Sequence, residues 1–255
     1  MRYLSHYTKD DKAIKNGIQS KARKLASLKT FYQYYFSHGK IKHNPAAVVE
    51  IDIKDKNKDI IFLQPQEVVC LLECIESGNG FTARKLISQQ KTRIRDLAIV
   101  ILLLGTGIRV SECVGLDLDS IDFENGVIHV TRKGNFNDEV ENALSNYIEH
   151  DRQKYKPTET NHNALFLSSK HNRMSVGAVE YMIKQCVSIA PPHRKKITPH
   201  KMRSTFGSTL YYETGDIYAV ADALGHSDVN TTKRHYAAVD SEKRRENFRK
   251  ITLRE

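Results

Sequence analysis

The sequence predicts a mainly α-helical protein with one small antiparallel sheet. Apolar residues recur at intervals of three and four through most of the 255-residue chain, which is the spacing of one face of a helix. The clearest strand pattern is IDF, then Glu124-Asn125-Gly126, then VIHVT, because Asn-Gly supplies the positive φ that primed hairpin turns need. A hydrophobic content of 40% is sufficient for a sizeable core and for two domains.

The first fifty residues are predicted to form a helical module with a basic face. Apolar and aromatic residues keep helical spacing over 18–37, and Asn44-Pro45 closes this segment. In the following stretch, IDIKDKNKDI, charged residues of both signs separate the few apolar residues, which is typical of a linker. The predicted organisation is a partial helical domain over 1–50, a linker over 51–61 and a larger domain over 62–255 with a C-terminal helix over 240–253.

The larger domain carries most of the predicted helices. Residues 66–75 predict a helix. Residues 95–104 predict a buried helix, because they are apolar on all sides, and this helix stops at Gly105-Thr106-Gly107. LFL at 165–167 predicts a short strand. The remaining helices are expected from Ser111, over 140–148, from Ser175, from Thr198-Pro199 to about Tyr212, and from Ile217 to Leu224, where Gly225 ends the helix.

The charge balance favours a polyanionic partner. Forty Lys and Arg against thirty Asp and Glu give a formal charge of +10, which attracts nucleic acid first, with a membrane surface, heparin or merely solvated basic faces as alternatives. The longest apolar run, 98–104, is far shorter than the ~20 residues of a bilayer span, and MRYLSHYTKD lacks the apolar core of a signal peptide. We therefore expect a cytoplasmic protein with no membrane partner.

The four cysteines do not indicate a metal site. Cys70 and Cys74 are one helical turn apart, Cys113 and Cys186 lie in other helical runs, and no Cys or His set has zinc spacing. Buried reduced thiols are the favoured interpretation, with neither a metal nor another cofactor.

Two short segments carry residues suited to binding a phosphate. Arg109 follows the glycine-rich break, where a guanidinium can bind phosphate with two hydrogen bonds, and Glu112 one turn later either orients Arg109 or is solvated. His200 and Arg203 are three residues apart on one helix, which predicts that they lie side by side on the face away from Met202 and Phe206. Each of these residues taken alone also fits an ordinary surface position.

A third polar segment lies near the end of the chain. In LGHSDVNTTKRHYAAVD, Gly225 ends one helix and allows the chain to turn His226 inward, and a new helix is expected near Asp228. A histidine at this place is either a phosphate donor or a capping group. Tyr236, on the new helix, is either an attacking group or a surface tyrosine.

In combination these motifs resemble the tyrosine recombinase family of phage integrases, Xer-like recombinases and integrases of mobile elements. GTGIRVSECVGL at 105, HKMR at 200, LGHSD at 224 and Tyr236 have the family's order and separations, over about residues 20–255. The resemblance implies the DNA breaking-rejoining catalytic fold, preceded by a core-binding module. Because the family's module is larger than the fifty residues found here, we expect its first helices to be missing.

The resemblance also assigns roles. Tyr236 would be the nucleophile, and Arg109 and Arg203 would bind the non-bridging oxygens of the scissile phosphate and stabilise its pentacoordinate transition state without a metal. His200 would act as general base and phosphate donor, and His226 would donate to a phosphate oxygen. A phenol with a pKa of about 10 needs such neighbours to attack phosphorus. Further contacts to DNA are expected from Arg132, Lys201, Lys233 and Arg234.

One element departs from the family pattern. Lys133, or else Arg132, matches the hairpin lysine that protonates the leaving 5′ oxygen. Only Gly134, Asn135 and Phe136 separate Lys133 from NDEVENAL, which is a helix start. The sequence therefore predicts that the returning strand is absent and that protonation of the leaving group is impaired.

The predicted function is site-specific recombination or integration, in which duplex DNA is cleaved and rejoined through a 3′-phosphotyrosyl intermediate. The resemblance further implies a homotetramer on DNA, in which the C-terminal helix with Phe248 and Ile251 docks on a neighbouring subunit. That segment also fits a solvated basic helix. A type IB topoisomerase-like nicking and rejoining enzyme and a basic DNA-binding protein with a degraded site are the alternatives.

Overall fold

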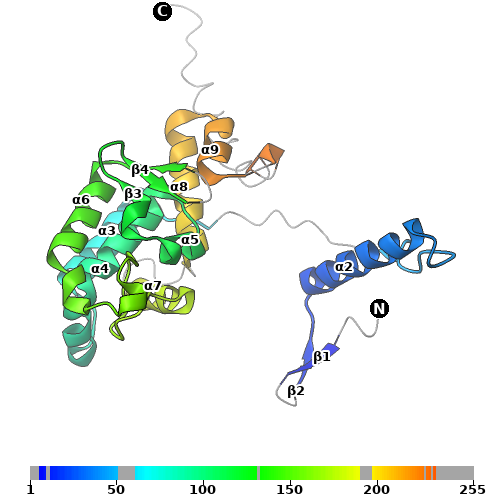
Figure 1. Cartoon of the computed structure of the whole chain (residues 1–255), viewed down its shortest axis with the longest axis horizontal. Helices are drawn as coiled ribbons and strands as arrows, with labels where there is room; N and C mark the ends of the chain where they lie inside the picture. Colours follow the sequence, from blue (N-terminus) through cyan, green and yellow to red (C-terminus); the bar gives the residue numbers. More distant parts are fainter. Residues whose placement is uncertain are drawn as a thin grey trace, which may run out of the picture. The chain divides into compact units, whose positions relative to one another are not determined.

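The computed structural model describes residues 6–9, 12–50, 61–130, 133–189, 197–226, 228–230 and 232–233, and for 6–9, 12–15, Arg84 and Lys133 it describes the backbone alone. The chain divides into two compact units, Met1–Lys58 and Asp59–Glu255, each of which is described by itself (Figure 1). None of the helices within the described ranges has the length and apolar character needed to cross a membrane.

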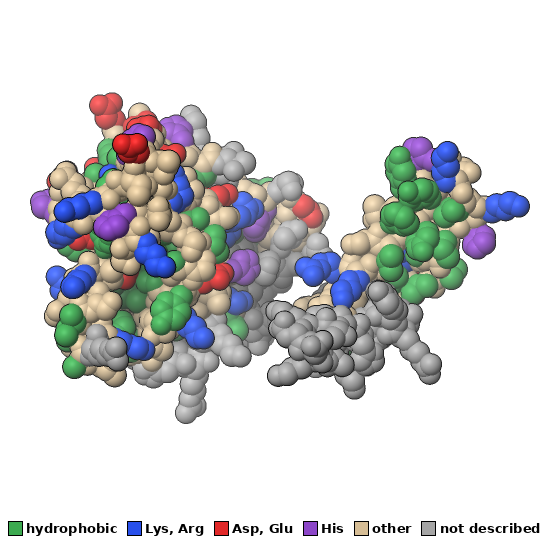
Figure 2. Space-filling view, turned by 60° about the horizontal axis from the view of Figure 1, so that its bottom comes forward, with side chains coloured by type: hydrophobic (Ala, Val, Ile, Leu, Met, Phe, Trp, Pro, Cys, Tyr) green, Lys and Arg blue, Asp and Glu red, His purple; other side chains and the backbone are tan. Residues whose placement is uncertain are grey.

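The smaller unit contains a hairpin and one long helix. Strands β1 (His6–Lys9) and β2 (Lys12–Lys15) pair antiparallel, and α2 (Ile18–Ser37) has the predicted bounds. Leu25 is the one buried residue of α2, and most of its apolar and aromatic side chains are exposed. Figure 2 shows these hydrophobic side chains gathered on the surface of the unit. The sequence patterns did not indicate the β1–β2 hairpin.

Helix α4 (Ala83–Thr106) is the central helix of the larger unit. It contacts α3 (Pro65–Ser77), α6 (Asp138–His150) and α8 (Pro199–Thr214), which are drawn around it in Figure 1. Residues 98–103 are all buried, as the apolar run predicted. The helix begins twelve residues before the predicted 95, because its first half is amphipathic and more polar, with one side at the surface.

A three-stranded antiparallel sheet follows α5 (Val110–Gly115) and the 3₁₀ turn η1 (Leu118–Ser120). Its strands are β3 (Ile121–Asp122), β4 (Val127–His129) and β5 (Lys133–Asn135). Ile128, which is fully buried, pairs with Ile121 on one side and Gly134 on the other. The hairpin predicted around Glu124-Asn125-Gly126 is confirmed, but its connection has four residues and Gly126 alone among them has a positive φ, so it is not the primed turn that Asn-Gly suggested.

Strand β5 overturns the expectation that the hairpin lacks a returning strand. His129 pairs with Lys133 and Val127 pairs with Asn135. Residues Lys133–Asn135 are therefore themselves the returning strand, which begins at Lys133. Lys, Gly and Asn have low strand propensity, so the sequence pattern did not predict this strand. Gly134 is buried, and a Cβ added to it would stand 3.8 Å from Cγ2 of Ile108, so the strand passes close to the turn before Arg109. The helix start at Asn137 is confirmed, because its side chain accepts from the Val140 N–H.

The rest of the unit is helical and irregular. Two further 3₁₀ turns, η2 (Arg152–Tyr155) and η3 (Glu159–Asn161), precede α7 (Val176–Ile189), and α8 is followed by α9 (Ile217–Leu224). The predicted strand at 165–167 is wrong. This segment is buried, but the chain bends at Leu165 and Phe166, and it forms only the single bridges Asp117–Ala164 and Leu167–Arg173 at its ends instead of a ladder.

Candidate active site

The glycine-rich break after α4 is a tight turn that packs on α8. Gly107 has a φ of 61°, and a Cβ added to it would stand 2.4 Å from Cδ1 of Phe206. Both the backbone conformation and the close approach therefore require glycine. The turn directs the chain into α5, whose N-cap is Arg109.

Glu112 orients Arg109. One carboxylate oxygen, Oε2, accepts the Arg109 backbone N–H at 2.6 Å, and the other, Oε1, accepts from Nη1 at 3.0 Å. The Glu112 side chain is 11% exposed and that of Arg109 is 49% exposed. Of the two interpretations left open by the sequence, the structure supports orientation. It also leaves the Arg109 guanidinium at the surface, where it can meet a large ligand.

Arg203 joins three of the sequence motifs. Its Nη1 donates to the Gly107 carbonyl at 2.5 Å, and its Nη2 donates to the Leu224 carbonyl at the end of α9. Arg203 is 6% exposed. These bonds hold the turn before Arg109, the second turn of α8 and the LGH segment together.

The prediction that His200 and Arg203 share the face of α8 away from Met202 does not hold for Arg203. His200 is exposed, whereas Arg203 is buried together with Met202. The reason is that α8 packs against α4 and against α9, so that small and polar side chains such as Ser204, Thr205 and Ser208 are also buried along it. The spacing predicted the helix correctly but not the direction of its inward face.

His226 is held by the residues on both sides of it. Gly225, with a φ of 60°, ends α9, and the His226 N–H donates to the Ala221 carbonyl. Its Nδ1 lies 2.8 Å from Oγ1 of Thr232, a residue with no exposed surface. The turn of His226 toward the protein is thus confirmed.

Thr232 is a site residue that sequence reasoning did not single out. Helical residues follow Asp228, whose carboxylate accepts the Asn230 N–H at 2.9 Å in an N-terminal cap. The cap places Thr232 one turn into the helix, facing His226. The Asp-x-Asn sequence at 228–230 could have indicated this residue, because a helix start at Asp228 determines which later side chains face His226.

The basic candidates lie in different environments. Lys201 is half-buried, and Lys233 is exposed with its Nζ 5.7 Å from the ring centroid of Tyr218, within range of a cation–π interaction. The β4–β5 hairpin lies beside the Arg109 turn, because a Cβ added to Gly134 would stand 3.8 Å from Cγ2 of Ile108. Tyr236, Arg132 and Arg234 lie outside the described residues, as does the side chain of Lys133.

All four cysteines carry free thiols, but the prediction that they are buried holds only for Cys113 and Cys186. Burial raises the pKa of Cys113 and of Cys186 to about 12, so these two are unreactive at neutral pH, whereas Cys70 and Cys74 are only half-buried. In the part of the chain that the structure describes, no group of three or more His, Cys, Asp and Glu side chains is placed to hold a metal ion.

Comparison with known proteins decides the family. The model of the phage integrase family matches residues 62–243, which include every motif described above. The chain belongs to this family of tyrosine recombinases. It is accordingly a site-specific recombinase, and the mainly helical fold with a small antiparallel sheet is confirmed.

Individual relatives support the assignment. A tyrosine recombinase XerC of Pediococcus pentosaceus is 32% identical over 239 residues, covering 90% of this chain and 74% of that protein. A XerC of Caldanaerobacter subterraneus is 34% identical, covering 98% of this chain and 67% of that protein. Among solved structures, the Tn1549 transposon integrase in complex with circular intermediate DNA superimposes with a TM-score of 0.70 at 27% identity, covering 89% of this chain and 78% of that one.

Proposed function

We propose that this recombinase cleaves and rejoins duplex DNA with Tyr236 as its nucleophile. The observation that carries the proposal is the pair of bonds from Arg203 to the carbonyls of Gly107 and Leu224, which brings the Arg109 turn and the His226 segment to one place. Three peptide units link the described Lys233 to Tyr236. The covalent chain alone therefore keeps the two Cα atoms within about 11 Å of each other.

In this mechanism the scissile phosphate lies against Arg109 and Arg203. The Tyr236 oxygen attacks phosphorus as its proton passes to His200, and the bond from phosphorus to the 5′ oxygen breaks. Lys133 protonates the departing 5′ oxygen. The 5′ hydroxyl of a second strand then attacks the same phosphorus and gives its proton to Lys133, while the bond from phosphorus to the Tyr236 oxygen breaks and His200 returns the proton to the tyrosine. No phosphodiester is lost and no ATP is consumed.

The electrostatics of the site suit this transition state. Its pentacoordinate phosphorus carries more negative charge than the ground state, and fixed donors aimed at that charge are most effective where water is excluded. Arg203 is buried and Glu112 pre-orients Arg109, so little reorganisation is needed when the charge develops. His226, held by Thr232, would donate to a remaining phosphate oxygen.

Duplex DNA is the proposed substrate, and the smaller unit is proposed to help bind it as a core-binding module. The net charge of +10 supports a polyanionic substrate. The structural relative named above is a transposon integrase solved with circular intermediate DNA.

We further propose a homotetramer in which the segment 240–253 of one copy docks on the next. An apolar groove of about 390 Å³ lies between α3, α4, α6 and α8. Its acidic lining residues, Glu139 and Glu213, complement the basic sequence SEKRRENFRK, and its apolar side chains suit Phe248 and Ile251. Val69 lines the groove and is 54% exposed.

The docking proposal is tested by the assembly state on DNA. Val69→Asp and Phe248→Asp should each abolish complexes with more than one subunit per site pair in analytical ultracentrifugation, while single-site binding stays within two-fold. Ile87→Asp, which changes another exposed apolar residue outside the groove, is the matched control. Normal assembly by both groove and tail variants would contradict this arrangement.

The reaction is tested with a duplex recovered by binding selection from random sequence. Plasmids carrying two copies of that site should give excised circles with intact strands, and the products should form equally in EDTA. Relaxation without excision would favour the topoisomerase-like enzyme. Binding with neither product would favour the DNA-binding protein with a degraded site.

A further inference from the structure

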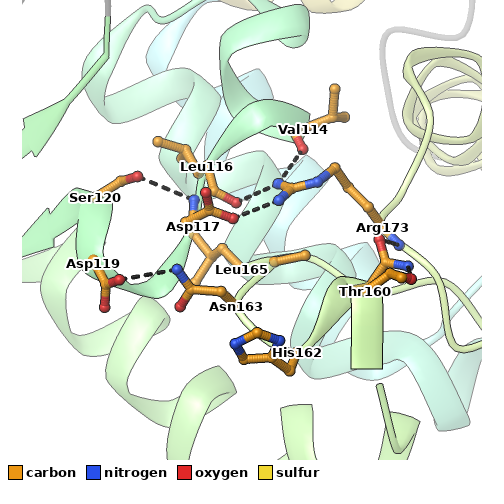
Figure 3. A network of polar contacts seen from close by, with 12 residues as sticks. Val114, Leu116, Asp117, Asp119, Ser120, Thr160, His162, Asn163, Leu165 and Arg173 are labelled. Carbon is orange, nitrogen blue, oxygen red and sulfur yellow. Dashed lines mark hydrogen bonds and ion pairs between the residues drawn. The ribbon is translucent and has the colours of Figure 1, made fainter. Parts of the chain in front are cut away.

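Arg173 holds the end of α5 that is opposite Arg109. Figure 3 shows its guanidinium directed at the backbone that leaves this helix. Nη1 donates to the carbonyls of Val114 at 3.1 Å and Leu116 at 2.7 Å, and Nη2 forms an ion pair with the Asp117 carboxylate. One side chain thus contacts three positions, 114, 116 and 117, at and just beyond the C-terminal end of α5.

The loop that carries Arg173 is itself tightly fixed. Leu167 and Arg173 form a β-bridge across the turn, and the Ser168 N–H donates to the Asn172 carbonyl at 2.8 Å. The Arg173 N–H donates to Oδ1 of Asn161 at 3.2 Å. His171 has a φ of 66°, a conformation that residues other than glycine rarely adopt and that persists only when the surroundings impose it. The position of Arg173 is therefore set from outside α5.

Helix α5 depends on such support because it has only six residues. A helix of this length is not stable by itself, and its two ends are separated by only about 9 Å at 1.5 Å per residue. Glu112 lies in its first turn and the Arg173 cation at its last carbonyls, so both charges complement the helix dipole. A displacement at the Arg173 end is transmitted directly to Arg109 at the other.

We propose that Arg173 is a positioning residue of the recombination reaction, which sets the placement of the Arg109 guanidinium relative to Arg203 through α5. This inference rests on the proposed role of Arg109 at the phosphate. Arg203 is tied to Gly107, two residues before Arg109, whereas the Arg109 side chain has its one described bond to Glu112 of the same short helix. The separation of the two cations thus follows the placement of α5, and misplacement by about 1 Å slows a positioned reaction strongly.

The first measurement is single-turnover cleavage at saturating DNA by Arg173→Lys. An ammonium cannot reproduce the forked contacts to two carbonyls and a carboxylate. We expect cleavage at least ten-fold slower, with the Kd for DNA unchanged within two-fold. Arg93→Lys is the matched control, because Arg93 also donates to a carbonyl near a helix C-terminus, that of Glu76 at 3.0 Å, but on α3. Arg93→Lys should change neither the cleavage rate nor the Kd for DNA.

A double-mutant cycle separates positioning from general stability. If Arg173 acts through Arg109, Arg173→Lys should slow cleavage less than two-fold in an Arg109→Lys background. Fully multiplicative effects, or an unchanged rate in Arg173→Lys alone, would overturn the proposal. If Arg173→Lys does not fold, the same cycle with Asp117→Asn, which leaves both carbonyl contacts in place, decides by the same criterion. Arg109→Lys tested alone reports on the proposed function separately, since an unchanged rate there would contradict the role of Arg109 itself.

Discussion

Arg203 of α8 donates from Nη1 to the carbonyl oxygen of Gly107 at 2.5 Å, across 96 residues of sequence. The bond fixes the buried guanidinium of Arg203 to the turn that leads into Arg109. Phe206, one turn further along α8, packs against the same glycine. Placement of the two arginines is therefore expected to be sensitive to any change at position 107.

Gly107→Ala should destabilise the protein and slow cleavage. The added methyl group would stand 2.4 Å from the Phe206 ring at a φ of 61°, so both sterics and backbone strain oppose it. We expect a loss of about 1–3 kcal/mol in the free energy of unfolding, measured in urea. Gly177→Ala is the control, because Gly177 lies in α7 with nothing within 4 Å of its added Cβ. Equal stabilities of the two variants would contradict this account of the turn.

Arg109→Lys and Arg203→Lys should each slow cleavage by on the order of 10², but they should differ in stability. Neither ammonium reproduces a bidentate phosphate contact. Arg203→Lys also loses bonds to two buried carbonyls, whereas Arg109 is half-exposed with its described side-chain bond to Glu112. Thermal denaturation should therefore show a lower Tm for Arg203→Lys alone. Equal Tm values with slowed cleavage would place Arg203 in catalysis but not in the support of the turn.

Much of this site follows from sequence order, and the errors have physical causes. The helices around Arg109, Arg203 and His226 were predicted because glycine and Thr-Pro mark their ends. The inward direction of Arg203 was not, since it depends on α4 and α9 packing on both sides of α8. The residues around Arg173 do not indicate its role, because its partners, two backbone carbonyls and the Asp117 carboxylate, lie more than fifty residues earlier. Because every residue has a backbone carbonyl, a hydrogen bond to one does not restrict the type of the accepting residue.

The complete β4–β5 hairpin changes the expectation for Lys133. Since Lys133 begins a paired strand, its backbone is fixed opposite His129, as a general acid on a hairpin requires. Lys133→Ala should cleave ordinary DNA at least ten-fold more slowly than the natural protein. A 5′-bridging phosphorothiolate, whose sulfur leaves without a proton, should remove most of that difference. A slow reaction on both substrates would assign Lys133 to DNA binding instead.

Stability should fall at high pH through Tyr147. Burial raises its pKa to about 12, against about 10 in the unfolded chain. A folded-state pKa above the unfolded value means that this contribution is fully present below pH ~10 and is lost as the pH rises toward 12. Urea unfolding of Tyr147→Phe should show a shallower decline over this range. Tyr181→Phe, at a 64% exposed position, is the control, and identical slopes for all three proteins would contradict the prediction.

The central claim is that Tyr236 forms the covalent bond to DNA. Phenylalanine keeps the ring and removes only the attacking oxygen, so Tyr236→Phe should bind the selected duplex with an unchanged Kd. On a nicked suicide substrate, the natural protein should give an SDS-resistant adduct whose tryptic phosphopeptide, identified by mass spectrometry, contains Tyr236. Tyr236→Phe should give no adduct. An adduct of equal yield in Tyr236→Phe, or one mapped to another of the twelve tyrosines, would contradict the mechanism.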